Sequence, residues 1–174
     1  GQVAHFRTFG FVVHRQLFCS NEMKGIQRDF DEVMAKEAST GGRSSKGEPF
    51  TGEESQKLLW VVELSPYLAR LVEDDRIYNT VEQIIGQDPL WVMSDGHLFV
   101  GDTQWHSAGN GKPPVLDHMK VTIYLDRLTI DTGCLRVIPG SHRPEFQSNL
   151  KPLDVWSDDV HKDHPSRRAF GLTG

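Results

Sequence analysis

The stretch Gly101-Asp-Thr-Gln-Trp-His-Ser-Ala-Gly-Asn110 follows the alternating run Leu98-Phe-Val100 and predicts the end of a β-strand. Side chains two residues apart on a strand point to the same face, because strand side chains alternate with a period of two. His106 and Ala108 therefore share one face in this prediction. The interpretation of the rest of the chain depends on these two positions.

A histidine and an acid two residues apart, with a second histidine from elsewhere, form the two-histidine, one-carboxylate site that holds non-haem Fe(II). His106 fits the first position, but alanine stands at position 108, where the acid would be. A lone histidine in a strand is more often a packed or surface residue than a metal ligand. The neighbouring sequence is needed to choose between the two interpretations.

Further segments supply that context. They are Lys120-Val-Thr-Ile-Tyr-Leu-Asp126, Thr132-Gly-Cys-Leu-Arg-Val-Ile-Pro-Gly-Ser-His-Arg143 and the N-terminal Phe6-Arg-Thr-Phe-Gly-Phe-Val-Val13, followed by Leu17-Phe18. Together with residues 101–106 they resemble the phytanoyl-CoA dioxygenase family over nearly the whole chain. The resemblance implies an Fe(II)/2-oxoglutarate-dependent oxygenase with a double-stranded β-helix (jelly-roll, cupin-like) core.

Length and composition are those of an ordinary globular protein. The chain has 174 residues, enough for one domain, with 37% hydrophobic and 25% charged residues. Its net charge of -5 argues against a nucleic-acid binder, which usually presents a basic face. No apolar run is long enough to span a membrane, and the N-terminus lacks a signal-peptide pattern, so a cytoplasmic location is expected. Cys19 and Cys134 are expected to be buried thiols rather than a disulfide.

The first part of the chain predicts a strand and then a long helix. The β-rich run 9–18 predicts the strand, in which His14 is a structural or exposed residue, and Ser20 is a good N-cap for the helix. Residues 39–52 predict a surface loop. Apolar residues repeat at helical spacing and predict packing against a sheet: Met23, Ile26, Phe30, Val33 and Met34.

Residues 53–86 predict two short helices on either side of Pro66 and a third helix that Gly86 ends. Asp88-Pro89 then turns the chain into a β-rich part. Four strands are predicted there, over 90–94, 97–101, 120–126 and 134–138. The predicted fold class is α+β with a mostly β core, in one domain over residues 1–174. An N-terminal strand and helices (1–89) buttress the β-core (90–174).

The resemblance gives Ala108 a specific meaning. It makes His106 the first iron ligand, and Ala108 stands where the hydroxylases of the family have aspartate. In the wider superfamily, Ala or Gly at this position marks the aliphatic halogenases, in which chloride takes the vacated coordination site. A methyl group cannot bind a metal, and its small size leaves room for an anion. The alternatives are a degenerate enzyme or one that uses another carboxylate, such as Asp102 or Asp117.

The resemblance also places the 2-oxoglutarate contacts near Lys120 and Thr122, which share a face of the predicted strand 120–126. Their ammonium and hydroxyl groups could hold a carboxylate of 2-oxoglutarate. Thr103 is a further candidate, although an ordinary polar strand residue is the better interpretation for it. Trp105 and His142 are expected to line the pocket.

The second iron ligand is not expected among the histidines of this sequence. His142 follows a turn, where the family has a pocket or structural residue, and His161 and His164 lie in a polar, acidic stretch. The family's distal histidine and its 2-oxoglutarate arginine come later, so we expect both to lie beyond Gly174. The β-helix is then truncated at its C-terminus, and its exposed sheet edge favours a homodimer.

The sequence therefore predicts a non-haem Fe(II)/2-oxoglutarate-dependent oxidoreductase that acts on a C–H bond of a small molecule. Ala108 favours halogenation as the outcome. The alternatives are a hydroxylase that uses another acid and a catalytically silent jelly roll that binds a small molecule. Fe(II) and 2-oxoglutarate are the expected cofactors, with chloride in the case of a halogenase.

Overall fold

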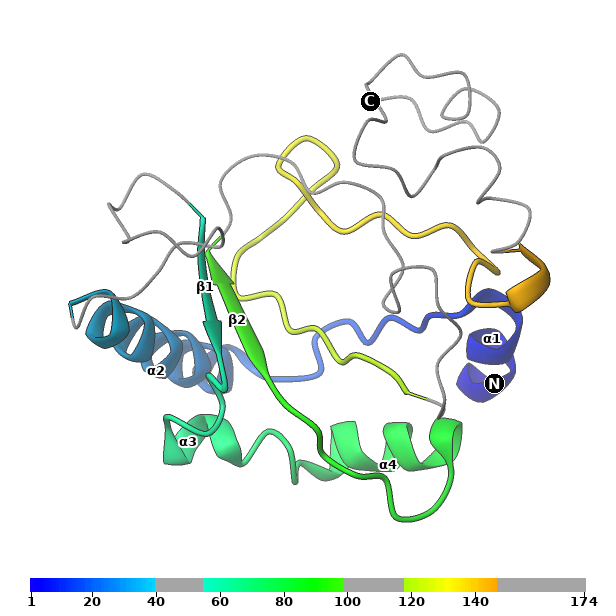
Figure 1. The fold of residues 1–174 in the computed structure, drawn as a ribbon, viewed down its shortest axis with the longest axis horizontal. Coiled ribbons are helices and arrows are strands. Elements are labelled where there is room, and N and C mark those ends of the chain that lie inside the picture. Colours follow the sequence, from blue (N-terminus) through cyan, green and yellow to red (C-terminus); the bar gives the residue numbers. More distant parts are fainter. Residues whose placement is uncertain (40–54, 99–117, 147–174) are drawn as a thin grey trace. The chain divides into compact units, whose positions relative to one another are not determined.

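The computed structural model describes residues 1–39, 55–98 and 118–146 (Figure 1). The elements in these residues are α1 (Gln2–Phe9), α2 (Ser20–Ser39), β1 (Gln56–Leu59), α3 (Pro66–Ala69), α4 (Asp75–Ile85) and β2 (Asp95–Leu98). The chain groups into two compact units, which we describe separately. The central unit comprises residues 14–101 and 120–129, and the terminal unit comprises 1–13, 102–119 and 130–174. The single domain predicted over residues 1–174 stays a prediction.

Helix α2 is the longest element of the central unit and carries the predicted apolar stripe. Ile26, Val33 and Met34 are buried, which confirms that this face packs in the core. The helix begins one residue earlier than predicted, because the Cys19 carbonyl already accepts the first helical hydrogen bond, from the Met23 amide. Glu22 accepts a hydrogen bond from the Cys19 amide at 2.7 Å, which satisfies a donor at the start of the helix.

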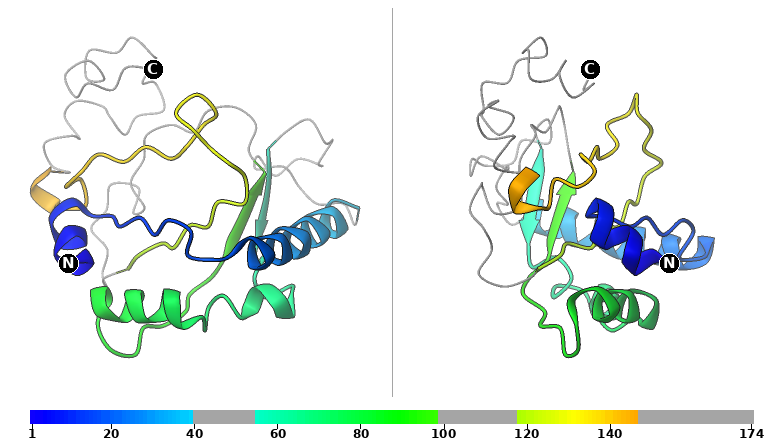
Figure 2. Two further views of the ribbon diagram at one scale, coloured as in Figure 1. Left: turned by 180° about the vertical axis from the view of Figure 1, so that it is seen from behind. Right: turned by 90° about the vertical axis from the view of Figure 1, so that its right-hand side faces the viewer.

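Strands β1 and β2 form a two-stranded antiparallel sheet, with Lys57 opposite His97 and Leu58 opposite Gly96. One face of the sheet lies against α2 (Figures 1 and 2). There the buried Gln56 side chain donates to the Met34 carbonyl at 3.1 Å. The packing is close at Gly96, where an added Cβ would lie 2.7 Å from the Phe30 ring. The sheet is therefore fixed on α2 through its inner face.

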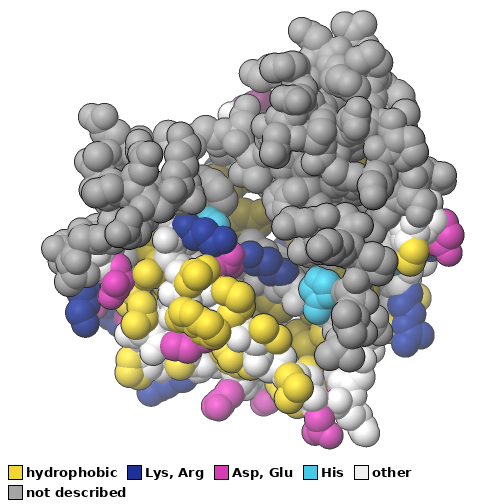
Figure 3. Space-filling view, viewed as in Figure 1, with side chains coloured by type: hydrophobic (Ala, Val, Ile, Leu, Met, Phe, Trp, Pro, Cys, Tyr) yellow, Lys and Arg dark blue, Asp and Glu magenta, His cyan; other side chains and the backbone are white. Residues whose placement is uncertain are grey.

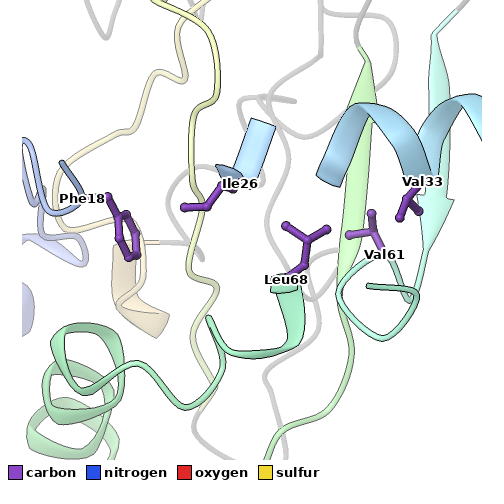
Figure 4. Close-up of a cluster of buried hydrophobic side chains, with 5 residues drawn as sticks. All are labelled: Phe18, Ile26, Val33, Val61 and Leu68. Carbon is purple, nitrogen blue, oxygen red and sulfur yellow. The ribbon is translucent and has the colours of Figure 1, made fainter. Parts of the chain in front are cut away.

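Helices α3 and α4 follow β1, and both start at capped residues. Ser65 accepts hydrogen bonds from two amides at the start of α3, with Pro66 in the first helical position. Asp74 accepts one at the start of α4, and Gly86 ends that helix, as predicted. One hydrophobic cluster combines side chains of α2 and α3 with one residue before α2 and one after β1, and Figure 4 shows its members: Phe18, Ile26, Val33, Val61 and Leu68.

A charged cluster joins the start of α4 to the start of α2, and we name it the Arg76 cluster. Arg76 Nη2 lies 2.7 Å from Asp74 Oδ2 and 2.8 Å from Glu22 Oε1. Its Nη1 donates to the Leu17 carbonyl at 3.0 Å, and its guanidinium lies over the Phe18 ring at 4.4 Å from the centroid. One arginine thus contacts both helix caps and the edge of the core.

The terminal unit is organised around the C-terminus of α1. Gly10 ends this helix in a left-handed conformation (φ 83°), and its amide donates to the Phe6 carbonyl. Residues 140–143 then bind the carbonyls of the last turn. The Gly140 amide donates a hydrogen bond to the Phe9 carbonyl at 2.8 Å, and Arg143 Nη2 donates one to the Thr8 carbonyl at 3.0 Å. A helix of this length gains little stability by itself, so these contacts matter to it.

Several predicted elements are wrong. The run 9–18 is not a strand, because α1 continues to Phe9 and the rest has no ladder hydrogen bonds. The predicted helix before Pro66 is replaced by β1, whose residues pair with β2 instead of with each other. Residues 90–94 form no strand, and β2 begins at Asp95, before the predicted start at His97. Residues 99–101 lie outside the described part of the chain, as do residues 40–52 of the predicted loop 39–52, whose first residue, Ser39, ends α2.

The segments 120–126 and 134–138 also form no strands. In the first, burial still alternates: Ile123 and Leu125 pack partly on the core while Thr122 and Tyr124 are exposed. The sequence signal was therefore correct for the side chains. A strand also needs a partner strand to form a ladder of hydrogen bonds, and the described residues contain no partner for this segment.

Many large apolar side chains remain on the surface, and Figure 3 shows hydrophobic groups gathered on one face. Leu90, Val92 and Ile130 are at least 73% exposed. Both cysteines are free thiols, as predicted, but Cys19 is exposed and Cys134 half-buried, so neither is the fully buried thiol expected. Within the described ranges, no helix has the length and apolar character needed to cross a bilayer.

Candidate functional site

The outer face of the sheet in the central unit carries a group of ionisable side chains. Asp95 and His97 alternate with Gly96 along β2, so both point away from α2, and Lys57 stands opposite His97. His97 Nε2 lies 2.9 Å from Asp95 Oδ2, and Lys57 Nζ lies 3.8 Å from the same oxygen. Because a carboxylate only accepts, this nitrogen of His97 is the protonated one.

Lys120 joins this group from the extended segment that follows. Its Nζ lies 2.7 Å from Asp95 Oδ1 and donates to Oδ2 at 2.9 Å. The Lys120 side chain is 64% exposed, whereas Asp95 is only 17% exposed. We name Lys57, Asp95, His97 and Lys120 the Asp95 cluster.

The electrostatics of the Asp95 cluster favour the ionised carboxylate. Partial burial on its own would raise the pKa of Asp95, but the hydrogen bonds from His97 and Lys120 outweigh it and hold that pKa below its ordinary value. Two ammonium groups face this single carboxylate, so among the described residues one positive charge has no counter-charge. The cluster can therefore attract a further anion.

The inner face of the sheet sets the position of this charged face. Gly96 lies between Asp95 and His97 and allows β2 to approach the Phe30 ring and Val61 closely. Gln56 holds β1 to α2 by its hydrogen bond to Met34. Because adjacent strand residues point to opposite faces, fixing the inner residues also fixes the charged ones.

The described side chains suit an anionic co-substrate better than a metal ion. In the part of the chain that the structure describes, no three His, Cys, Asp or Glu side chains are close enough together to hold a metal. The Asp95 carboxylate already contacts two ammonium groups, which would repel a divalent cation. A carboxylate of 2-oxoglutarate, in contrast, would meet a complementary charge at Lys120.

Most of the predicted site residues lie outside the described residues. These are the predicted ligand His106, Ala108, the candidates Thr103 and Trp105, and the alternative acids Asp102 and Asp117. His161 and His164, which were not expected to bind iron, also lie outside the described residues. Lys120 and Thr122 are described and both are exposed, although on an extended segment rather than on the predicted strand. Their contact with 2-oxoglutarate stays a prediction.

The structure places His142 at the end of α1 in the terminal unit. Its Nε2 is within 3.3 Å of the Arg7 carbonyl, and its ring lies so close to Gly10 that an added Cβ there would be 2.4 Å from Nδ1. The side chain is exposed. These contacts give His142 a structural role, and its place in a substrate pocket stays a prediction.

His14 was expected to be structural or exposed. It is half-buried, and its Nε2 is buried without a hydrogen-bond partner among the described residues.

Sequence reasoning missed Lys57, Asp95 and His97. The alternation Asp95-Gly-His97 places an acid and a histidine on one face, which was a usable signal. Lys57 gave no such signal, because it was assigned to a helix. Its place opposite His97 follows only from the pairing of β1 with β2.

Comparison with known proteins agrees with the resemblance seen in the sequence. The profile of the family Phytanoyl-CoA dioxygenase (PhyH) matches residues 6–169. The ectoine dioxygenase of Halomonas elongata is 26% identical over 181 aligned residues, which cover 98% of this chain and 53% of the relative. The ectoine dioxygenase of Bordetella bronchiseptica is 26% identical over 174 residues, with coverages of 92% and 55%.

The ectoine dioxygenase of Streptomyces coelicolor is 28% identical over 144 residues, which cover 77% of this chain and 48% of the relative. The chain thus spans about half the length of the curated relatives it matches. No solved structure shows a significant match. Because the family profile extends over nearly the whole sequence, the chain belongs to the phytanoyl-CoA dioxygenase family.

Proposed function

We propose that this protein acts as a non-haem Fe(II)/2-oxoglutarate-dependent dioxygenase on a C–H bond of a small molecule. The observation that carries the proposal is the family match over residues 6–169. In such a reaction O2 oxidises 2-oxoglutarate to succinate and CO2, and the second oxygen atom oxidises the substrate. Ectoine, the compound in the relatives' names, is the first substrate to assay.

Within this proposal, His106 is a ligand of the iron, and Lys120 holds a carboxylate of 2-oxoglutarate. The second assignment is supported by the positive charge of the Asp95 cluster that no described carboxylate balances. Thr122 follows two residues later in an exposed position and can donate its hydroxyl to the same carboxylate, with Thr103 as a further candidate. Trp105 and His142 line the pocket in this proposal. The core is a double-stranded β-helix, and the location is cytoplasmic.

The experiment that tests the proposal is anaerobic binding of Fe(II) and 2-oxoglutarate. A full-length form that carries the distal histidine should develop the weak visible charge-transfer band of the ternary complex. His106→Ala should lose the band and bind 2-oxoglutarate more weakly. His5→Ala is the control, because it removes an exposed imidazole of α1 that the proposal does not use. A band of equal intensity in His106→Ala would contradict the assignment of the ligand.

A second candidate function is halogenation, and Ala108 is the observation that favours it. If chloride occupies the position next to the iron, chloride should tighten the binding of 2-oxoglutarate, since linkage between two ligands is reciprocal. Ala108→Asp should abolish this response by placing a carboxylate there, and Ala108→Ser serves as the control of similar size. If chloride has no effect on the wild type, the halogenase proposal is wrong and the dioxygenase proposal remains.

The proposed partners are a small-molecule substrate and a second copy of the chain. Each strand of the β1–β2 sheet has one partner among the described residues, and an unpaired strand edge can bind another strand. Light scattering at several protein concentrations tests for the homodimer.

A further inference from the structure

We propose that Asp95 is the positioning residue of Lys120 and thereby sets the affinity for the carboxylate of 2-oxoglutarate. This inference rests on the proposed function, in which Lys120 binds that carboxylate. It adds a residue that does not contact the ligand but determines where the ammonium group lies.

The first step concerns the freedom of Lys120. Its side chain is 64% exposed and comes from a segment without strand pairing among the described residues. A lysine in such a place samples many rotamers, and ordering it on a ligand costs conformational entropy. Asp95 removes most of this freedom before the ligand arrives, since both carboxylate oxygens lie within 2.9 Å of Nζ.

The second step concerns the rigidity of Asp95 itself. The residue lies on β2, and its side chain is 17% exposed. A second hydrogen bond, from His97 Nε2 at 2.9 Å, orients the carboxylate from the same strand. Gly96 fixes that strand against α2 by its close contact with Phe30. The carboxylate is thus held by a packed element, whereas the ammonium is not.

The third step concerns the donors that remain. An ammonium group has three N–H donors, and a single carboxylate does not occupy all of them. Because most of the Lys120 side chain faces solvent, the remaining donor capacity is accessible to a second carboxylate. Lys57, 3.8 Å from Asp95, helps to balance the negative charge of Asp95, which would otherwise repel the ligand.

Electrostatics alone predicts the opposite result, and this makes the inference easy to test. Removing the negative charge of Asp95 should strengthen binding of an anion if charge were all that mattered. If positioning dominates, Asp95→Asn should weaken binding of 2-oxoglutarate by roughly threefold to tenfold, because Lys120 then regains rotamers that the ligand must restrict. Asp95→Glu, which keeps the carboxylate, should recover part of the affinity.

The experiment is calorimetric titration of the full chain with 2-oxoglutarate in the presence of Fe(II), under anaerobic conditions and at physiological salt. Asp126→Asn is the matched control, because it removes the same charge from an exposed position in the segment of Lys120. It should leave the affinity unchanged or slightly tighter. Lys120→Ala should weaken binding by roughly tenfold or more, since it removes a charge-assisted hydrogen bond.

A double-mutant cycle separates positioning from a general structural effect. In the Lys120→Ala background, Asp95→Asn should cause no further loss of affinity, because Asp95 acts through Lys120. A further loss of the same size would make Asp95 a merely structural residue and overturn the inference. Unchanged or tighter binding by Asp95→Asn in the wild-type background would overturn it as well. If Lys120→Ala itself leaves the affinity unchanged, the proposed role of Lys120 fails, and the inference fails with it.

Discussion

The Arg76 cluster and the Asp95 cluster are both held by ionic contacts, but their balance of positive and negative charge is opposite. In the first, one guanidinium contacts two carboxylates, a backbone carbonyl and an aromatic ring. In the second, two ammonium groups share one carboxylate. The planar guanidinium has its donors committed to the fold, whereas Lys120 retains donors that face solvent. A charged cluster with all its donors used stabilises structure, and one with spare donors can bind a ligand.

The largest effect is expected where packing supports the Asp95 cluster. Gly96→Ala would bring a methyl group within 2.7 Å of the Phe30 ring and close to Val61. Such overpacking should lower the free energy of unfolding by about 1–3 kcal/mol. Phe30→Leu in the same chain should restore part of the loss by making space. Denaturant titration of the two single variants and the double variant measures this. If the two losses of stability simply add in the double variant, the strain does not come from the contact between residue 96 and Phe30.

The next largest effect is expected in the Arg76 cluster. Arg76→Ala removes the contacts to Glu22 and Asp74 and uncovers the Phe18 ring, so the thermal midpoint should fall by several degrees. Arg70→Ala, an exposed arginine after α3, is the control and should change the midpoint little. Calorimetric or circular-dichroism melting gives the comparison. Equal thermal midpoints for the two variants would show that the Arg76 cluster does not stabilise the fold.

The pH dependence of stability gives a third test, again in the Arg76 cluster. The hydrogen bond from Arg76, together with that from the Cys19 amide, lowers the pKa of Glu22 from 4.5 to about 2. A lowered folded pKa means that the stabilisation is complete above pH 4.5 and is lost as the pH falls towards 2. Glu22→Gln should reduce the change of the free energy of unfolding with pH between pH 4.5 and pH 2, whereas Glu73→Gln should not. If both variants keep the wild-type slope, Glu22 does not have the lowered pKa.

The smallest effect on stability is expected for Lys120→Ala. Its ion pair with Asp95 is exposed on the lysine side, so the free energy of unfolding should change by only about 0–1 kcal/mol. The same variant should lose affinity for 2-oxoglutarate, as described above. Chemical denaturation and calorimetry on one preparation compare the two quantities. A large loss of stability would show that Lys120 serves the fold, as Arg76 does.

The sequence predicted those parts of the fold in which local pattern and burial agree. The stripe of α2 and the end of α4 at Gly86 were correct, because an amphipathic period and a terminating glycine are both local signals. β1 was mistaken for a helix, since a run of four residues contains too little periodicity to decide. Its strand identity comes from pairing with β2, which is about 40 residues away in the sequence.

The candidate site shows the same limit. Lys120 was chosen for its charge and its place in the family pattern, but nothing near it in the sequence indicated Asp95, 25 residues earlier, as its partner. In the sequence Arg76 cannot be told from the other arginines, because its role depends on Leu17 and Glu22, which only the fold brings beside it. Chemistry that depends on a single residue type was visible in the sequence. Chemistry that depends on tertiary neighbours was not.

The cap on α1 has a consequence for the order in which the protein folds during synthesis. Helix α1 leaves the ribosome well before Gly140 and Arg143, which bind its last carbonyls and are made more than 130 residues later. At about 5–20 residues per second, this delay lasts roughly 7–27 s. An eight-residue helix is only marginally stable alone, so α1 is not secured until residues 140–143 have been made. During that interval its apolar side chains are open to chaperones and proteases.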